Sequence, residues 1–364
     1  MTVVFFHFGG ILPIPRTSPW SQIIRAGDVS VSYFFTLSGF IMAVAYFRTD
    51  GKLNVVRYAV ARIARIYPLY LLSLLLIAPL VMYQGDHGKR VLLLNLALLQ
   101  AWFPRYALTF NSPAWSLSVE AFFYVCFPLL LWVFARRSPR ALVIIAGAFW
   151  VGSQVTHAYL LKNYYQPYPS LVHSALSFFP LIHLNAFIVG LILGILFKKF
   201  REHIQLSRFV TAGGIILSTG VICVFLAYWK VFAARLDLDV VLTNGLLAPL
   251  FGVFILFLAL DQSWIARTMQ QKWLVLLGEA SYGIYILQEP FSQYYFYHFA
   301  PHTNWSEIII SYGFYILLIV LAVIIYRWYE TPLRLWIRQL GDKLLRISFR
   351  QQFHRFPTNK KSRM

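Results

Sequence analysis

The chain has 364 residues, of which 59% are hydrophobic and only 12% are charged, and its mean hydropathy is +0.64. These values lie outside the range of soluble globular domains and indicate a protein embedded in a membrane. The net charge of +19 does not indicate a nucleic-acid-binding protein, because Lys and Arg stand between apolar blocks rather than on one basic face. The two cysteines, Cys126 and Cys223, are too few for a disulfide framework.

The first apolar block, residues 1–14, is too short to cross a membrane. About 14 residues at about 1.5 Å each give about 21 Å, which is less than the hydrocarbon thickness of about 30 Å. The block has no Lys or Arg at its start, as a signal peptide would have. We therefore expect that a first membrane span begins upstream of Met1 and is truncated in this chain.

Further along the chain, nine apolar blocks have the length of about 20 residues that a transmembrane helix needs. They cover residues 29–47, 66–84, 115–134, 141–160, 176–197, 209–228, 240–260, 273–297 and 307–328. The segment 92–103 is apolar but shorter, and it is predicted to form a half-helix or an interfacial helix. With the first block included, the sequence predicts an all-α, polytopic transmembrane bundle of about ten spans over residues 1–330.

The distribution of Lys and Arg predicts how the bundle is oriented. In the ten-span topology with a cytoplasmic N-terminus, 24 of the 32 Lys and Arg residues fall in cytoplasmic segments and 8 fall on the other side. Cytoplasmic loops carry such an excess, so both termini are expected in the cytoplasm. Residues 331–364 form a basic tail whose apolar residues alternate with Lys and Arg, which predicts an amphipathic helix lying on anionic lipid.

Ionisable residues inside apolar spans are candidates for function, because their burial in a membrane is costly. They are His7, Glu120, His183, Glu279, Glu289 and Glu330. The first of them lies in the segment VVFFHFGG with no other polar side chain nearby. Imidazole exchanges protons near neutral pH, so His7 could be a general base. It could equally be a neutral histidine that is hydrogen-bonded between helices.

Two arginines, Arg62 and Arg65, stand at the predicted cytoplasmic mouth of the span that begins near residue 66. Residues three apart on a helix share one face, so both guanidinium groups could bind the phosphates of one nucleotide-like cofactor. Anchoring of the span by positive charge at the cytoplasmic side explains them equally well.

A third candidate is the segment SPAWSLSVEAFF, in which Glu120 falls about one turn into an apolar span. Trp115 and Ser116 precede it and supply an aromatic ring and a hydroxyl group of the kind that sugar-binding sites use. The carboxylate could orient a histidine or hold a substrate hydroxyl. Alternatively, Glu120 could be a helix N-terminal carboxylate that is stabilised by the macrodipole and by free backbone N–H groups.

Taken together, six segments resemble the acyltransferase-3 family of membrane O-acyltransferases, in order and in spacing. They are FFHFGG, VSYFFTLSGFIMA, NVVRYAVARIARIYPLYLL, SPAWSLSVEAFFYVCFPLLL, LGEASYGIYILQEPF and YETPLR. The resemblance implies a ten-span bundle in a bacterial inner membrane. Such an enzyme uses cytoplasmic acyl-CoA, commonly acetyl-CoA, to acylate hydroxyl groups of polysaccharides, lipopolysaccharide or related carbohydrate acceptors.

The resemblance also assigns roles to individual residues. The first-span histidine of the family falls on His7, the R-x-x-R pair on Arg62 and Arg65, and the carboxylate of the WSLSVE segment on Glu120. We expect the arginines to hold the CoA phosphates and the histidine to deprotonate the acceptor, directly or through an acyl-histidine. Glu120 would orient the base or the acceptor, and the preceding Trp and Ser would contact the acceptor. No metal is expected.

Three positions depart from the family pattern. Ala121 stands where the family has a second carboxylate, Gln288 where a histidine is frequent, and Ala186 where a later carboxylate is common. The Lys or Arg that family members usually carry eleven residues before the histidine would lie upstream of Met1.

Two other classes of function stay open on the sequence alone. Ten spans with intramembrane His and Glu also describe a proton-coupled transporter or flippase, although the two halves of the chain show no internal similarity. An inactive scaffold of a polysaccharide assembly complex is the other alternative. For the acyltransferase we expect the carbohydrate acceptor, acyl-CoA, membrane lipid and polysaccharide biosynthesis proteins as partners, and no nucleic acid.

Overall fold

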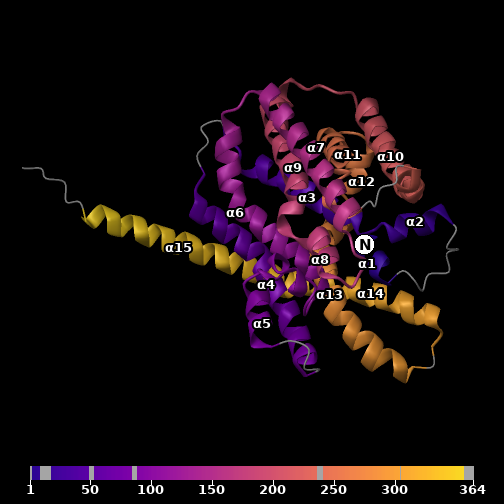
Figure 1. Cartoon of the computed structure of the whole chain (residues 1–364). Helices are drawn as coiled ribbons and strands as arrows, with labels where there is room; N and C mark the ends of the chain where they lie inside the picture. Colours follow the sequence, from indigo (N-terminus) through magenta and orange to yellow (C-terminus); the bar gives the residue numbers. More distant parts are fainter. Residues whose placement is uncertain are drawn as a thin grey trace, which may run out of the picture.

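The fold is described from a computed structural model, over residues 2–8, 18–48, 53–83, 88–235, 241–303 and 305–355. Within these ranges the chain is helical and contains no strand, which confirms the predicted all-α class. The α-helices are α1 (Thr2–Phe8), α2 (Pro19–Arg25), α3 (Val29–Tyr46), α4 (Val55–Tyr83), α5 (Lys89–Leu96), α6 (Trp115–Ala135), α7 (Pro139–Tyr164), α8 (Leu171–Phe178), α9 (Pro180–Phe200), α10 (Arg208–Arg235), α11 (Ala248–Leu260), α12 (Trp264–Met269), α13 (Lys272–Tyr294), α14 (Glu307–Ile325) and α15 (Thr331–Arg355). Figure 1 shows their arrangement in a bundle.

Among the described residues, seven helical segments are long and apolar enough to cross a membrane. They are Val29–Tyr46, Val55–Met82, Ser112–Ala135, Pro139–Tyr164, Leu171–His203, Arg208–Arg235 and Glu307–Leu345. Each of them contains one of the predicted spans or most of it. The chain is therefore a multi-pass membrane protein.

The other three predicted spans have a different outcome. Block 240–260 does not form one long helix, because Gly245 adopts a left-handed φ of 87° and α11 starts only at Ala248. The 13 residues of α11 reach about 20 Å, too short to cross the hydrocarbon alone. Block 273–297 forms α13, which is not among the seven. The first block is described only over Thr2–Phe8, and its remainder lies outside the described residues. The total of ten spans and the side of each terminus stay predictions.

The short apolar segment 92–103 is confirmed as too short to span. It consists of the end of α5 and a 3₁₀ turn, Gln100–Trp102. The predicted tail is helical as far as the structure describes it, because α14 continues through a π-helical turn, Tyr326–Glu330, into α15. In Figure 1, α15 extends away from the bundle after its first turns, which contact α4.

The described residues form five apolar clusters, and the two largest of them position the site. The first joins α3, α6 and α9 around fully buried rings such as Phe123, Phe127 and Phe187. The second joins α4, α13 and α14 around residues such as Leu69 and Phe314. Helices α3 and α6 meet α4 and α13 where these clusters adjoin, and the candidate site lies there.

The first cluster depends on an unusually close contact between α3 and α9. A Cβ atom on Gly190 would lie 1.9 Å from the carbonyl oxygen of Thr36, and one on Gly39 would lie 2.2 Å from that of Phe187. The two backbones touch because neither glycine has a side chain, as small residues permit between membrane helices.

We predict that Gly190→Val destabilises the protein by about 2–3 kcal/mol, because α3 and α9 must separate to admit the side chain. Gly220→Val in α10 is the matched control, since a Cβ atom there meets nothing within 4 Å. Thermal unfolding of both variants in detergent checks this expectation. Equal unfolding temperatures for the two variants would contradict it.

Candidate functional site

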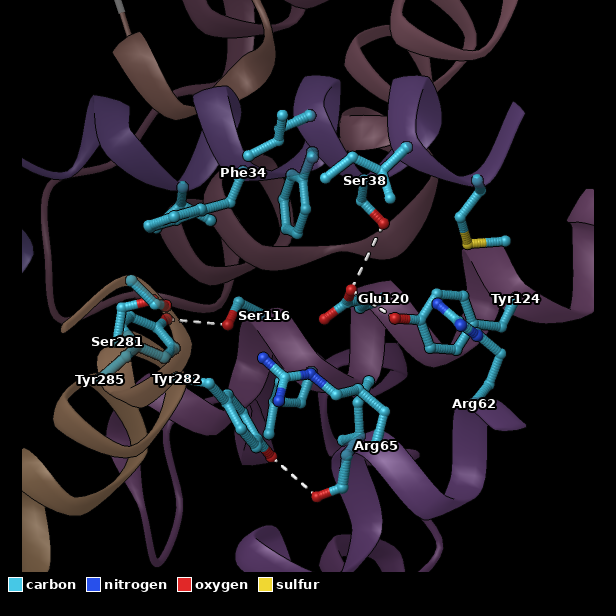
Figure 2. Close-up of a pocket in the computed structure, with 18 residues that line it drawn as sticks. Phe34, Ser38, Arg62, Arg65, Ser116, Glu120, Tyr124, Ser281, Tyr282 and Tyr285 are labelled. Atoms are coloured by element: carbon cyan, nitrogen blue, oxygen red, sulfur yellow. Dashed lines mark hydrogen bonds between the residues drawn. The ribbon is translucent and has the colours of Figure 1, made fainter. Parts of the chain in front are cut away.

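A cavity of about 360 Å³ lies between α3, α4, α6 and α13, and Figure 2 shows its lining. Residues far apart in the sequence meet here. The polar side chains in its wall are Ser38, Arg62, Arg65, Ser116, Glu120, Tyr124, Ser281, Tyr282 and Tyr285. Four of the six residues predicted for the site therefore line one cavity. They are Arg62, Arg65, Ser116 and Glu120.

Glu120 occupies the centre of this wall and is held by hydroxyl groups. Its Oε1 accepts a hydrogen bond of 2.6 Å from Tyr124, one turn further along α6, and one of 3.3 Å from Ser38 of α3. Figure 2 shows the carboxylate between these two donors. The bonds come from side chains and not from the free N–H groups at the start of α6. The structure therefore supports a carboxylate directed into the cavity over a helix-terminal one.

Arg62 is a cation whose described surroundings contain no carboxylate within ion-pair distance. Its guanidinium carbon lies 5.5 Å from the ring centre of Tyr46 and 5.7 Å from that of Tyr124. Its Nη2 donates to the Tyr46 hydroxyl at 3.2 Å, and its buried Nε has no partner in the part of the chain that the structure describes. Aromatic faces stabilise a cation without neutralising it, so the positive charge stays available to an anionic ligand.

Arg65 has different surroundings. Its Nη1 forms an ion pair with Glu330, a carboxylate with no exposed surface, and Arg334 lies 4.0 Å from the same carboxylate oxygen. The guanidinium also lies 5.8 Å from the ring centre of Tyr282. Both arginines of the R-x-x-R pair reach the cavity, as predicted from their spacing, but Arg65 already has an anionic partner.

Ser116 and Trp115 begin α6 and point in different directions. Ser116 lines the cavity, where its Oγ lies 2.8 Å from the Tyr285 hydroxyl and donates to the carbonyl of Pro113 at 3.0 Å. Trp115 is only 7% exposed and packs against Phe178, with ring centres 5.0 Å apart. The tryptophan lies behind the wall, and its predicted contact with a sugar stays a prediction.

His7 lies on α1 and is not among the residues that line the cavity. Its exposed imidazole neighbours the rings of Phe6 and Phe8, at 5.1 and 6.2 Å between centres. Helix α1 packs against α3 and α13, which both contribute to the cavity wall. The catalytic role of His7 stays a prediction.

Several site residues were not found from the sequence. Tyr124 could have been, because it lies four residues after Glu120 and so on the same helix face. Tyr282 and Tyr285 share a face in the segment SYGIY in the same way. The partner of Arg65 could not be found, because Glu330 lies 265 positions away in the sequence. Over the part of the chain that the structure describes, no group of three or more His, Cys, Asp or Glu could hold a metal ion.

Comparison with known proteins decides the family. The sequence model of the family described as acyltransferase domain, acyltransferase-3, matches residues 1–327. The chain belongs to the acyltransferase-3 family. This assignment confirms the resemblance of the six segments and accounts for the cavity as part of a membrane acyltransferase.

Curated relatives of this acyltransferase-3 protein carry related names. It is 36% identical over 116 residues to acyltransferase MdmB of Streptomyces mycarofaciens, covering 30% of this chain and 29% of the relative. It is 23% identical over 344 residues to O-acetyltransferase OatA of Staphylococcus aureus, covering 86% of this chain and 54% of the relative. A putative acetyltransferase, ORF330 of Acidianus two-tailed virus, is 26% identical over 288 residues, which is 79% of this chain and 78% of the relative.

The chain thus spans about half the length of OatA, and the match to MdmB covers under a third of that protein. No solved structure matches.

We predict that Arg65 and Glu330 stabilise the acyltransferase-3 fold as a pair. Replacing only Glu330 by Gln should cost about 2 kcal/mol, because a largely buried guanidinium loses its counter-charge. The double variant Arg65→Gln, Glu330→Gln should regain part of this loss. A double-mutant cycle on thermal unfolding measures the coupling.

The matched control is the exposed pair Arg57 and Asp342, whose side chains are 69% and 44% exposed. Its disruption should cost less than about 1 kcal/mol. If the two cycles gave the same coupling energy, burial would not decide the strength of the Arg65–Glu330 pair.

Proposed function

We propose that this protein transfers an acyl group, in the first instance acetyl, from acyl-CoA to a hydroxyl group of a cell-surface or exported carbohydrate. It would do so as a ten-span protein of a bacterial inner membrane with both termini in the cytoplasm. The observation that carries the proposal is that Arg62 and Glu120 line the same cavity, where Arg62 has no carboxylate partner among the described residues. The names of MdmB and OatA support acyl transfer and O-acetylation respectively.

The chemistry follows from these groups. The acceptor hydroxyl attacks the thioester carbonyl, so that a C–O bond forms, the C–S bond breaks, and CoA leaves as a thiolate that takes up a proton. We assign the removal of the acceptor proton to His7 and the orientation of the acceptor to Glu120. Arg62 and Arg65 would hold phosphates of the donor, with Arg62 as the stronger contact because it has no counter-charge.

The acceptor would be bound by hydrogen-bonding groups along the same wall. Ser38, Ser116 and Tyr285 present hydroxyl groups of the kind that exchange hydrogen bonds with a carbohydrate. Phe34 and Phe35 line the same cavity and offer apolar faces for a sugar ring. Trp115, which packs against Phe35, would support this aromatic surface from behind.

Acyl-CoA-dependent labelling tests the proposal as a whole. Membranes containing the protein, with radiolabelled acetyl-CoA and total surface glycan from a strain that lacks the gene, should yield labelled, alkali-sensitive carbohydrate. A transporter or a scaffold would yield none above the level of membranes without the protein. Absence of label with the full range of glycans and acyl-CoAs would contradict the proposal.

We predict that Arg62→Lys raises KM for acyl-CoA about tenfold and changes kcat less, because lysine keeps the charge but loses the planar fork that binds phosphate. Arg267→Lys, an exposed arginine outside the cavity, is the control. Initial rates at varied acyl-CoA concentration separate the two constants. An unchanged KM for acyl-CoA would show that Arg62 does not bind the donor.

Substitution of His7 or Glu120 should lower kcat and change KM for acyl-CoA little, the opposite of the effect expected for Arg62→Lys. His7→Ala should lower kcat at least about 100-fold, the usual contribution of a general base. Glu120→Gln keeps the size of the side chain but removes its charge, and should lower kcat about tenfold or more with little change in KM for acyl-CoA. A His7→Ala enzyme with near wild-type kcat would show that another group accepts the proton.

A further inference from the structure

A second cavity, of about 310 Å³, lies where α15 crosses the start of α4. We call it the α4–α15 cavity. Its lining consists of Tyr46, Arg57, Val60, Ala61, Arg338, Gly341, Asp342 and Leu345. Neither the family match nor the site described above uses it. Its two arginines and its position beside the first cavity point to an anionic ligand.

The cavity results from a regular spacing of charges that begins at the end of the π-helical turn Tyr326–Glu330 and continues along α15. Glu330, Arg334, Arg338 and Asp342 follow one another at intervals of four residues and so lie along one helix face. The outer two of these bind arginines of α4: Glu330 pairs with Arg65, and Asp342 with Arg57. The two helices are therefore joined at two points, and the α4–α15 cavity lies along the stretch between them.

Arg338 lies on this stretch without an anionic partner among the described residues. It lines the cavity, whereas its neighbour Arg334 is 4.0 Å from Glu330. Arg57 donates to Asp342 through both Nε and Nη2 at 3.0 Å, but this pair is exposed. Exposed ion pairs contribute little net free energy, so an incoming anion could take over Arg57 as well. The cavity thus offers one free guanidinium and one exchangeable guanidinium.

The α4–α15 cavity is next to the cavity that contains Glu120, which we call the bundle cavity. Tyr46 lines the α4–α15 cavity, Arg62 lines the bundle cavity, and these two side chains are hydrogen-bonded at 3.2 Å. On α4, Arg57 precedes Arg62 by five residues, which is about 7.5 Å along the helix axis. A ligand that extended along this stretch would meet Arg57 first, then Arg338 and Arg62, and would then approach Glu120.

We propose that the α4–α15 cavity binds the phosphate groups at the nucleotide end of acyl-CoA, while the bundle cavity takes the thioester end. This inference rests on the proposed function, because it assigns the two ends of that donor to two cavities. It makes Arg338 and Arg57 binding residues and gives the start of α15 a role beyond membrane association. Arg62, between the cavities, contacts the donor at the junction.

The experiment measures ligand binding to the purified full chain in a neutral detergent by calorimetry. The probes are coenzyme A, adenosine 3′,5′-bisphosphate as its nucleotide end, and S-acetylpantetheine as its thioester end. Arg338→Gln should weaken binding of the first two at least tenfold and leave that of S-acetylpantetheine unchanged. Arg267→Gln, which removes the same charge from an exposed position outside both cavities, should bind all three like the wild type.

Asp342→Asn is expected to strengthen binding of the nucleotide, whereas Arg338→Gln weakens it. It frees Arg57 from its carboxylate, so binding of adenosine 3′,5′-bisphosphate should become several-fold tighter. A variant that bound this nucleotide more weakly would overturn the exchange of Arg57 between Asp342 and the ligand. Retained binding of S-acetylpantetheine shows that each variant is folded.

Failure of the inference and failure of the proposed function give different results. If wild-type protein binds coenzyme A but Arg338→Gln binds it equally well, the α4–α15 cavity is not the nucleotide site and the proposed function stands. If wild-type protein binds no coenzyme A, the proposed function is wrong. If Arg338→Gln weakens only the binding of phosphatidylglycerol, added in mixed micelles, the cavity holds a lipid headgroup and the inference is overturned.

Discussion

The backbone contact between α3 and α9 is the constraint on which the site depends. Gly39 and Gly190 bring the two helices together so closely that no side chain fits between them. Because successive residues on a helix are turned by about 100°, the residue before Gly39 faces away from α9 and into the cavity. That residue is Ser38, whose hydroxyl reaches Glu120 on α6. A motif that allows helices to pack is therefore also part of the site.

The charged groups of the cavity wall lie in a medium of low dielectric constant, and this explains which neighbours surround each of them. An isolated ion in such surroundings is costly, and each charged group here is stabilised in a different way. Glu330 neutralises Arg65, aromatic rings and a hydroxyl surround Arg62, and two hydroxyl donors hold Glu120. Only the first of these arrangements cancels the charge. The cavity consequently keeps one positive and one negative group for interaction with a ligand.

How much could be predicted from the sequence depended on the range of the interactions. Span length and the spacing of Arg62 and Arg65 are local properties, so seven spans and the shared face of the arginines were predicted correctly. The break before α11 depends on the left-handed turn at Gly245, which the apolar composition of the block does not reveal. The unequal surroundings of the two arginines depend on Glu330, more than 260 positions away, and no local pattern contains that contact.

Two of the three departures from the family pattern, Ala186 and Gln288, can now be interpreted in terms of burial. Ala186 has no exposed surface. A Cβ atom built on Gly245 would lie 3.2 Å from the Cβ atom of Ala186. A carboxylate at this position would need space and hydrogen-bond donors that the contact with Gly245 does not provide. Gln288 is also fully buried, and neither end of its amide has a partner among the described residues. Neither of these positions therefore supplies a second carboxylate to the cavity, and Glu120 is the carboxylate in its lining.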